Sequence, residues 1–234
     1  MRVAIAKFPG SNCDQDVAYA ISRVPGAWSE VVWHTELSPE RYELVVLPGG
    51  FSYADRLRAG AIAAHTPLIE KLIDYVKDGG LVLGICNGFQ ILVEAGLLLG
   101  SLLPNKGLRF ICKWVSLRVM NSDTPFTNAF EESEVVKMPI AHYEGRYYAG
   151  GQALRLFEER RVAFVYADER GGVSEECNPN GSDNSIAGVF NDTFNVLGMM
   201  PHPERASDPL LSPYGTEHGL RVFLSVANYV KGGA

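Results

Sequence analysis

Short hydrophobic runs alternate with amphipathic stretches through the first hundred residues of the chain. The apolar runs at 2–8, 30–34, 43–50 and 81–86 are rich in β-branched and aliphatic residues and predict strands. After the first run, we expect Asn12 to cap a helix that carries apolar side chains at helical spacing. The run at 81–86 is wholly apolar, which is typical of a central strand in a parallel sheet covered on both faces.

Three further helices follow from the same periodicity. Thr66 and Pro67 supply an N-cap and a proline at the first helical position, and the pattern that they begin ends at Gly79. Its predicted buried stripe comprises Leu68, Ile69, Leu72, Ile73 and Val76. A second helical pattern covers 89–96, and an amphipathic helix closes the chain after a predicted cap at Thr216.

The middle of the chain lacks strong helical patterns. Strand-like runs lie at 112–120, 134–143 and 162–168, and the runs at 185–191 and 195–202 predict a hairpin. We interpret these runs as antiparallel additions to the parallel core. The sequence therefore predicts a single α/β domain over residues 1–234, with an open, mostly parallel sheet, antiparallel additions and helices on both faces.

Composition narrows the class of protein. The 234 residues are 47% hydrophobic and 21% charged, as in ordinary globular proteins, and the net charge of −6 argues against a nucleic-acid binder. The first apolar run is too short for a signal peptide, and polar residues interrupt the apolar region 81–103, so we expect no membrane span and a cytoplasmic location. Four cysteines without a CxxC pair predict neither a zinc site nor a disulfide framework.

Gly84, Cys86 and Gly88 stand where the run 81–86 gives way to a helical pattern. This is the sulfur version of the G-x-S-x-G nucleophile elbow, in which a strand turns at once into a helix. The two glycines remove side chains that would collide at such a corner. The helix N-terminus would favour a thiolate and offer an N–H group to an oxyanion. The alternative is a buried structural cysteine in a glycine-rich turn.

His202 has the best context of the five histidines for activating this thiol. It follows an apolar run, and α/β active sites gather at the carboxyl ends of strands. Glu204 lies two residues further on, so in an extended segment its carboxylate would point the same way and orient the imidazole. Taken alone, the His-Pro-Glu motif is better explained by a solvated surface turn.

A glycine pair, Gly49 and Gly50, followed by Phe51, ends the predicted strand 43–50. Bare glycines leave backbone N–H groups free to approach a ligand, and they could complete an oxyanion hole with the N–H of Asn87. An ordinary turn is the alternative for this motif alone. All three motifs fall at the carboxyl ends of predicted strands, so one shared site explains them better than three coincidences.

In this order, the three motifs resemble those of the class I, or triad, glutamine amidotransferases. Segments along essentially the whole chain are similar to the glutaminase subunits of phosphoribosylformylglycinamidine synthases, in the small-chain form of bacteria and archaea. These segments are KFPGSNCDQD (7–16), PGGFSYADRLRAGAIA (48–63), GICNGFQIL (84–92), PIAHYEGRYY (139–148), NPNGS (178–182), SIAGVFN (185–191) and MMPHPER (199–205). Ala54 departs from the family, which has glycine there, and its methyl group is expected beside the glutamine pocket. Arg56 has no physical interpretation.

The resemblance implies a flavodoxin-like fold and hydrolysis of L-glutamine through a thioester on Cys86. His202 is then the base, and Glu204 orients it. The implied substrate-binding and oxyanion-hole positions are Gly49, Gly50, Phe51, Asn87 and Gln90.

The resemblance also places His142, Glu144 and Arg146 near the site or a partner interface. A cross-strand ion pair explains Glu144 and Arg146 equally well.

The resemblance implies two partner subunits. The sequence contains no G-x-x-x-x-G-K-[ST] phosphate loop and no acidic cluster suited to Mg²⁺, so we expect no cofactor and no metal in this chain. ATP and Mg²⁺ are expected in a large synthetase subunit that makes formylglycinamidine ribonucleotide for purine biosynthesis, and a small subunit would bridge the two. Because ammonia in neutral water is mostly protonated, it must pass directly to that second active site.

Two other functions stay open. Elbow-cysteine hydrolases and peptidases share the scaffold, but they commonly have an acidic residue that assists the cysteine, whereas Asn87 follows Cys86 here. A non-catalytic scaffold subunit is the second alternative. Such subunits usually lack a member of the triad, and this chain has all three.

Overall fold

Parallel strands form one half of a nine-stranded sheet in the computed structural model, which describes residues 1–232. The strand order is β2-β1-β3-β4-β11-β10-β9-β6-β7, and the pairings from β2 to β11 are parallel. These strands are β1 (Arg2–Lys7), β2 (Trp28–Trp33), β3 (Leu44–Leu47), β4 (Leu81–Ile85) and β11 (Val196–Met199). The sheet thus has the open α/β arrangement that the sequence predicts.

The other half of the sheet is antiparallel, as predicted for the middle of the chain. Its strands are β10 (Ile186–Phe190), β9 (Val162–Ala167), β6 (Ile111–Val119) and β7 (Val135–His142). Strands β9 and β7 run in the direction of the parallel strands, because an even number of antiparallel steps separates each from β11. A separate two-stranded sheet pairs β5 (Ser101–Leu103) with β8 (Arg146–Tyr148).

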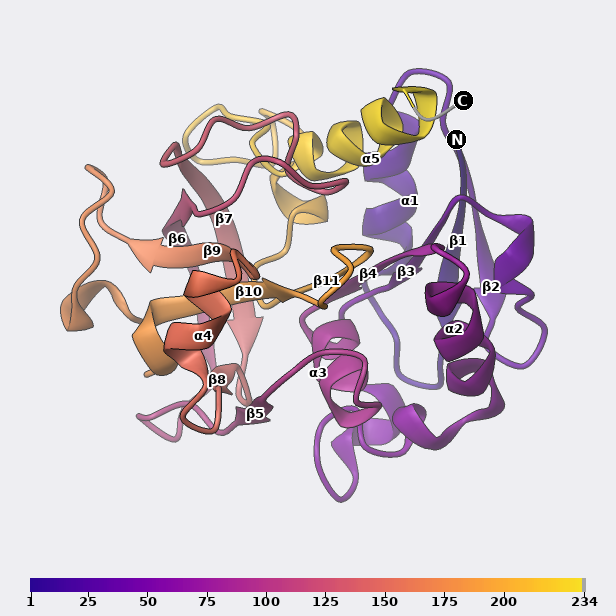
Figure 1. Cartoon of the computed structure of the whole chain (residues 1–234), viewed down its shortest axis with the longest axis horizontal. Helices are drawn as coiled ribbons and strands as arrows, with labels where there is room; N and C mark the ends of the chain where they lie inside the picture. The colour runs from indigo at the N-terminus through magenta and orange to yellow at the C-terminus, as the bar shows by residue number, and fades with distance from the viewer. Residues whose placement is uncertain (233–234) are drawn as a thin grey trace.

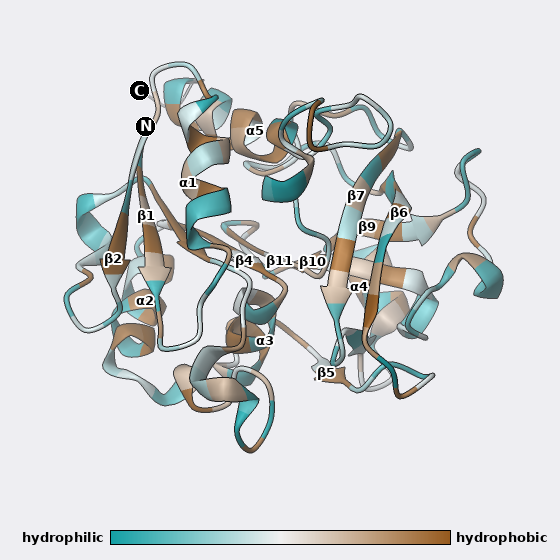
Figure 2. Ribbon diagram, turned by 180° about the vertical axis from the view of Figure 1, so that it is seen from behind, coloured by the Kyte–Doolittle hydropathy of each residue, from teal (hydrophilic) through white to brown (hydrophobic). Residues whose placement is uncertain are grey.

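Helices lie on both faces of the sheet (Figure 1). The helices are α1 (Asp14–Ser22), α2 (Pro67–Lys77), α3 (Asn87–Glu94), α4 (Ala153–Glu158) and α5 (Leu220–Gly232). Both ribbon views place α1 and α5 on one side of the parallel strands and α2 and α3 on the other (Figures 1 and 2). The short 3₁₀ helices are η1 (Pro39–Arg41), η2 (Ser52–Asp55), η3 (Ala63–His65), η4 (Glu175–Cys177), η5 (Asp183–Ser185) and η6 (Glu204–Ala206). None of the helices within residues 1–232 has the length and apolar character needed to cross a membrane.

The burial of the strands follows from this layering. Every residue of β3, β4 and β11 is buried, because helices cover both faces of the parallel half. Strand β7 alternates between buried and half-buried residues, as expected where one face alone meets the core. In Figure 2, the strands of the parallel half are mostly brown and lie between α1 and α5 on one side and α2 and α3 on the other.

Two local predictions are wrong, and one short helix is missing from the predicted elements. Helix α1 has its N-cap at Cys13 rather than Asn12, because the Asn12 and Cys13 N–H groups both donate to the Gly49 carbonyl oxygen. Helix α4 was not predicted, because six residues are too few to establish a periodic pattern. Helix α5 begins at Leu220, and the Thr216 hydroxyl instead pairs with that of Ser212.

Candidate active site

Cys86 occupies the corner between β4 and α3. Strand β4 ends at Ile85 and α3 begins at Asn87, so a single residue makes the turn. Its backbone has φ 52° and ψ −102°, a conformation that side-chain-bearing residues rarely adopt. The residue is 5% exposed, and its thiol donates a long hydrogen bond of 3.5 Å to the Ala141 carbonyl oxygen. The chain thus presents one strained cysteine at the carboxyl end of a buried strand.

Close contacts with neighbouring residues require glycine at both elbow positions, Gly84 and Gly88. A Cβ atom on Gly88 would lie 1.9 Å from the Leu47 carbonyl oxygen of β3. A Cβ atom on Gly84 would lie 2.5 Å from the Leu92 side chain and 2.7 Å from the backbone of Gly88. The close approach of α3 to β3 and β4 therefore explains the spacing seen in the sequence.

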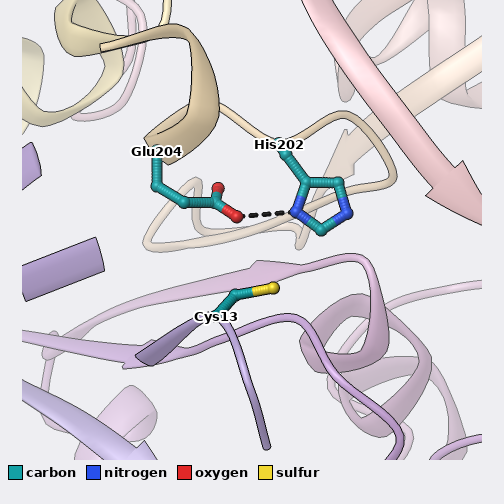
Figure 3. A group of neighbouring side chains, drawn as sticks. All are labelled: Cys13, His202 and Glu204. Carbon is teal, nitrogen blue, oxygen red and sulfur yellow. Dashed lines mark hydrogen bonds and ion pairs between the residues drawn. The ribbon is translucent and has the colours of Figure 1, made fainter. Parts of the chain in front are cut away.

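His202 and Glu204 form a buried pair (Figure 3). His202 is 1% and Glu204 0% exposed, and the imidazole Nδ1 lies 2.6 Å from the carboxylate Oε1. The solvated-turn alternative is therefore wrong. The expected extended segment is also wrong: Pro203 has helical backbone angles, and Glu204 begins η6. The two side chains meet across a tight turn.

The environment of His202 favours the imidazolium. Burial lowers the pKa of His202, but the Glu204 carboxylate and then the Cys86 sulfur raise it by more, so that its pKa lies well above the ordinary value. The second ring nitrogen, Nε2, is buried and forms no hydrogen bond with the residues that the structure describes. One nitrogen is thus held by the carboxylate, and the other is available for proton transfer.

The tertiary structure brings the cysteine and the histidine together. Strands β4 and β11 are parallel neighbours with Ile85 opposite Met199, and the Cys86 N–H donates to the Met199 carbonyl oxygen at 2.8 Å. The chain then leaves β11 and turns, and the His202 N–H donates to the Pro139 carbonyl oxygen of β7 at 2.8 Å. Cys86, His202 and Glu204 therefore lie at one edge of the sheet, where the Cys86 sulfur is near enough to raise the pKa of His202.

Cys13 is a third group beside the His–Glu pair (Figure 3). Its sulfur, an imidazole nitrogen and a Glu204 oxygen lie within 4.8 Å of one another, and an Arg205 N–H donates to the sulfur at 3.0 Å. These atom types suit Zn²⁺, but neighbouring ligand atoms around a tetrahedral zinc lie about 3.3 Å apart or more. The 2.6 Å contact between His202 and Glu204 fits a hydrogen-bonded pair rather than two metal ligands.

A small cavity of about 110 Å³ opens beside Cys86. Its lining residues come from the glycine turn, the elbow and the end of β7 with the turn after it: Gly50, Phe51, Asp55, Cys86, Gln90, Ala141, His142, Tyr143 and Glu144. Gly50, Phe51 and Gln90 are among the positions that the sequence singles out for substrate, and Cys86 is its candidate nucleophile. Asp55 is not among the residues that the sequence singles out. Its position at the cavity depends on the path of the chain after the glycine turn, which the motif does not determine.

The glycine turn is tied to the loop after β1. The Phe51 N–H donates to the Gly10 carbonyl oxygen at 2.9 Å, so it is occupied, whereas the Gly50 N–H has no hydrogen-bond acceptor within residues 1–232. A Cβ atom on Gly49 would lie 2.7 Å from Cε1 of His202, so this glycine makes room for the imidazole. The Asn87 N–H is in the first turn of α3 and has no intrahelical acceptor.

A chain of amide hydrogen bonds fixes the walls of the cavity. The Ser52 N–H donates to Asn87 Oδ1 at 3.1 Å, and Asn87 Nδ2 donates to Gln90 Oε1 at 2.9 Å. Gln90 Nε2 in turn donates to the Glu144 carbonyl oxygen at 2.6 Å. Asn87 and Gln90 therefore join the glycine turn, the elbow and the segment after β7.

The segment 142–146 divides between two cavities. His142 and Glu144 line the cavity of Cys86, whereas Arg146 lines a separate one of about 780 Å³ with Lys106 and Arg118. Among the described residues, Glu144 and Arg146 form no ion pair; a Glu144 oxygen accepts the Ala59 N–H instead. Ala54 is exposed, has φ 56° and does not line the cavity, so its place in the left-handed region explains why glycine suits this position.

A cysteine elbow and a buried His–Glu pair at the carboxyl edge of a flavodoxin-like sheet define the site of a glutamine amidotransferase. The chain belongs to the CobB/CobQ-like glutamine amidotransferase domain family, whose sequence profile matches residues 1–230.

Comparison with individual proteins is more specific than the family profile. The chain is 53% identical to the phosphoribosylformylglycinamidine synthase subunit PurQ of Pyrococcus horikoshii, over 99% of both chains. It is 51% identical to the subunit of the same name from Aquifex aeolicus, over 97% of this chain and 99% of the relative. Among solved structures, it resembles a chain of PurLQS from Thermotoga maritima with a TM-score of 0.86 and 44% identity, over 98% of each chain.

Proposed function

We propose that this chain is the glutaminase subunit of a phosphoribosylformylglycinamidine synthase. It hydrolyses L-glutamine to glutamate and ammonia, and it delivers the ammonia to a synthetase subunit of the PurL kind. The observation that carries the proposal is the strained Cys86 at the elbow beside the buried His202–Glu204 pair. The full-length similarity to PurQ subunits supports the particular pathway.

The first half-reaction forms a thioester. The Cys86 sulfur attacks the carboxamide carbon of glutamine while His202 Nε2 holds the thiol proton. The Gly50 and Asn87 N–H groups stabilise the oxyanion, and one such donor contributes about 3 kcal/mol. Phe51, whose own N–H is occupied, forms a wall of the pocket, and Gln90 holds the substrate from the opposite wall. His202 then protonates the leaving nitrogen, and ammonia departs.

The second half-reaction releases glutamate. A water molecule deprotonated by His202 attacks the thioester carbon, and the Cys86 sulfur leaves as the thiolate. Glu204 stabilises the imidazolium in both halves because its carboxylate is buried against Nδ1. No step needs a cofactor or metal in this chain.

The partner subunits that we propose follow from the need to transfer ammonia before it is protonated. The synthetase subunit binds ATP, Mg²⁺ and formylglycinamide ribonucleotide, and a small third subunit bridges the two larger ones. All three work in the cytoplasm. Direct transfer keeps ammonia unprotonated and therefore nucleophilic.

Glutamate release tests the proposal. We expect weak release by the purified chain alone and strong activation by the synthetase subunit with its nucleotide substrate and ATP. Full activity of the isolated chain would contradict the coupling. Covalent labelling of Cys86 by a glutamine-mimicking diazo ketone, without cleavage of peptides, separates this function from that of an elbow-cysteine peptidase.

A further inference from the structure

The cavity beside Cys86 offers acceptors and no cationic side chain. Two carboxylates, Asp55 and Glu144, and one imidazole, His142, contribute to its lining, and neither lysine nor arginine does. Arg58, whose charge acts on Glu144, is engaged in paired hydrogen bonds with both oxygens of Glu94. Among the described residues, therefore, no lysine or arginine side chain lines the cavity to pair with these two carboxylates.

Asp55 lacks a partner for one of its oxygens. Its Oδ1 atom is buried and accepts no hydrogen bond from residues 1–232. Burial and then the nearby Glu144 carboxylate raise the pKa of Asp55 to about 6. Burial of a carboxylate oxygen without a partner costs free energy unless a ligand donates a hydrogen bond to it. Glu144 approaches from the other wall, where one of its oxygens accepts the Ala59 N–H at 3.2 Å.

His142 gives an independent indication of a ligand with N–H donors. It is 2% exposed, and its Nδ1 lies 3.0 Å from Asn105 Oδ1. The Asn105 amide group donates to two carbonyl oxygens, so its Oδ1 is an acceptor and His142 Nδ1 carries the proton. Nε2 is therefore an acceptor, and it is buried without a partner. Burial and then His202 lower the pKa of His142 to about 4, so the ring is neutral at pH 7.

We propose that Asp55 and Glu144 bind the α-ammonium group of L-glutamine, with His142 Nε2 as a third acceptor for the same group. An ammonium group has three N–H donors and one positive charge, which match three acceptors in a negatively charged cavity. The α-carboxylate of glutamine would be repelled there. This inference rests on the proposed glutaminase function and adds the residues that select an α-amino acid amide.

The test compares L-glutamine with 4-carbamoylbutanoate, which is the same molecule without the α-amino group. Glutamate or glutarate release is measured in the complex with the synthetase subunit. We expect the unaltered chain to favour L-glutamine in kcat/KM by at least about 100-fold. The variants are Asp55→Asn and Glu144→Gln, and asparagine tolerates the left-handed backbone of Asp55. Asp74→Asn, at an exposed carboxylate of α2, is the matched control.

Each binding variant should raise KM for L-glutamine by about 10- to 100-fold and leave kcat/KM for 4-carbamoylbutanoate within about threefold of the unaltered chain. The control variant should change neither value. Equal losses for both substrates, or an unaltered chain that does not distinguish them, would overturn the inference while the glutaminase function stands. A complex that hydrolyses neither amide would overturn the proposed function and this inference with it.

Discussion

The Nδ1 atom of His202 and the Oε1 atom of Glu204 are 2.6 Å apart in a site closed to solvent. Because the carboxylate cannot exchange this contact for water, it both fixes the tautomer of the ring and stabilises its positive charge. This one contact links the geometry of the proposed triad to the pH dependence that we expect of it.

Replacing Glu204 by glutamine should therefore shift the pH profile. The carboxylate raises the pKa of His202, so its loss lowers that pKa, and the imidazolium loses its proton at a lower pH. We expect the alkaline limb of kcat/KM to move towards neutral pH and kcat to fall by about 10²- to 10⁴-fold. Rate measurements from pH 6 to 10 in the complex give both values. An unchanged alkaline limb would contradict the assignment, and Glu175→Gln, at an exposed carboxylate of η4, is the control.

Removing the Cys86 sulfur should abolish hydrolysis. Cys86→Ala takes away the proposed nucleophile, and we expect glutamate release to fall by at least about 10³-fold, because no other cysteine of the described residues lines the cavity. Cys112→Ala, at an exposed cysteine of β6, should keep normal activity. Release by Cys86→Ala at the normal rate would remove the basis of the mechanism.

The strain at the elbow predicts an unusual order of stabilities. With φ 52° and ψ −102°, residue 86 adopts a conformation that glycine tolerates and alanine does not. We expect the free energy of unfolding of Cys86→Gly to exceed that of Cys86→Ala by about 1 kcal/mol or more, although both variants lack the sulfur. Urea denaturation of the two variants measures the difference. The reverse order would mean that the elbow is not strained.

Gly88 should tolerate no side chain. An alanine Cβ there would lie 1.9 Å from the Leu47 carbonyl oxygen, so α3 must move away from β3. We expect Gly88→Ala to lower the free energy of unfolding by at least about 2 kcal/mol and the melting temperature by about 5 °C or more. Gly107→Ala is the control, because a Cβ at Gly107 meets nothing within 4 Å. Equal melting temperatures for the two variants would refute this account of the elbow.

The affinity for glutamine should weaken in mild acid. Asp55 has its pKa raised to about 6, and its ionised form is the one that attracts an ammonium group. As pH falls through 6, Asp55 becomes neutral, so KM for L-glutamine should be about tenfold higher at pH 5 than at pH 7. KM for 4-carbamoylbutanoate should not follow this change, and Asp55→Asn should flatten it. A flat KM in the unaltered chain would count against a role for this carboxylate.

The local motifs were predictable because each depends on neighbours in the sequence. The glycines around Cys86 indicate a sharp strand-to-helix turn, and the structure has that turn between β4 and α3. Glu204 was predicted to meet His202, although through an extended segment, whereas the actual segment is a turn. The sequence does not identify Asp55 as a site residue, because no local pattern distinguishes a carboxylate in a cavity from one in solvent.

The alternation of strands and helices, the antiparallel middle and the choice of Cys86, His202 and Glu204 as candidate triad residues could be argued from the sequence alone. Periodicity and residue type depend on residues that are neighbours in the chain. Only the tertiary structure placed β4 beside β11, buried the His–Glu pair and set Asp55, Glu144 and His142 around one cavity. Those relations join segments far apart in the chain. They depend on which surfaces pack together. Packing between distant segments produces no periodic pattern in the sequence of either segment.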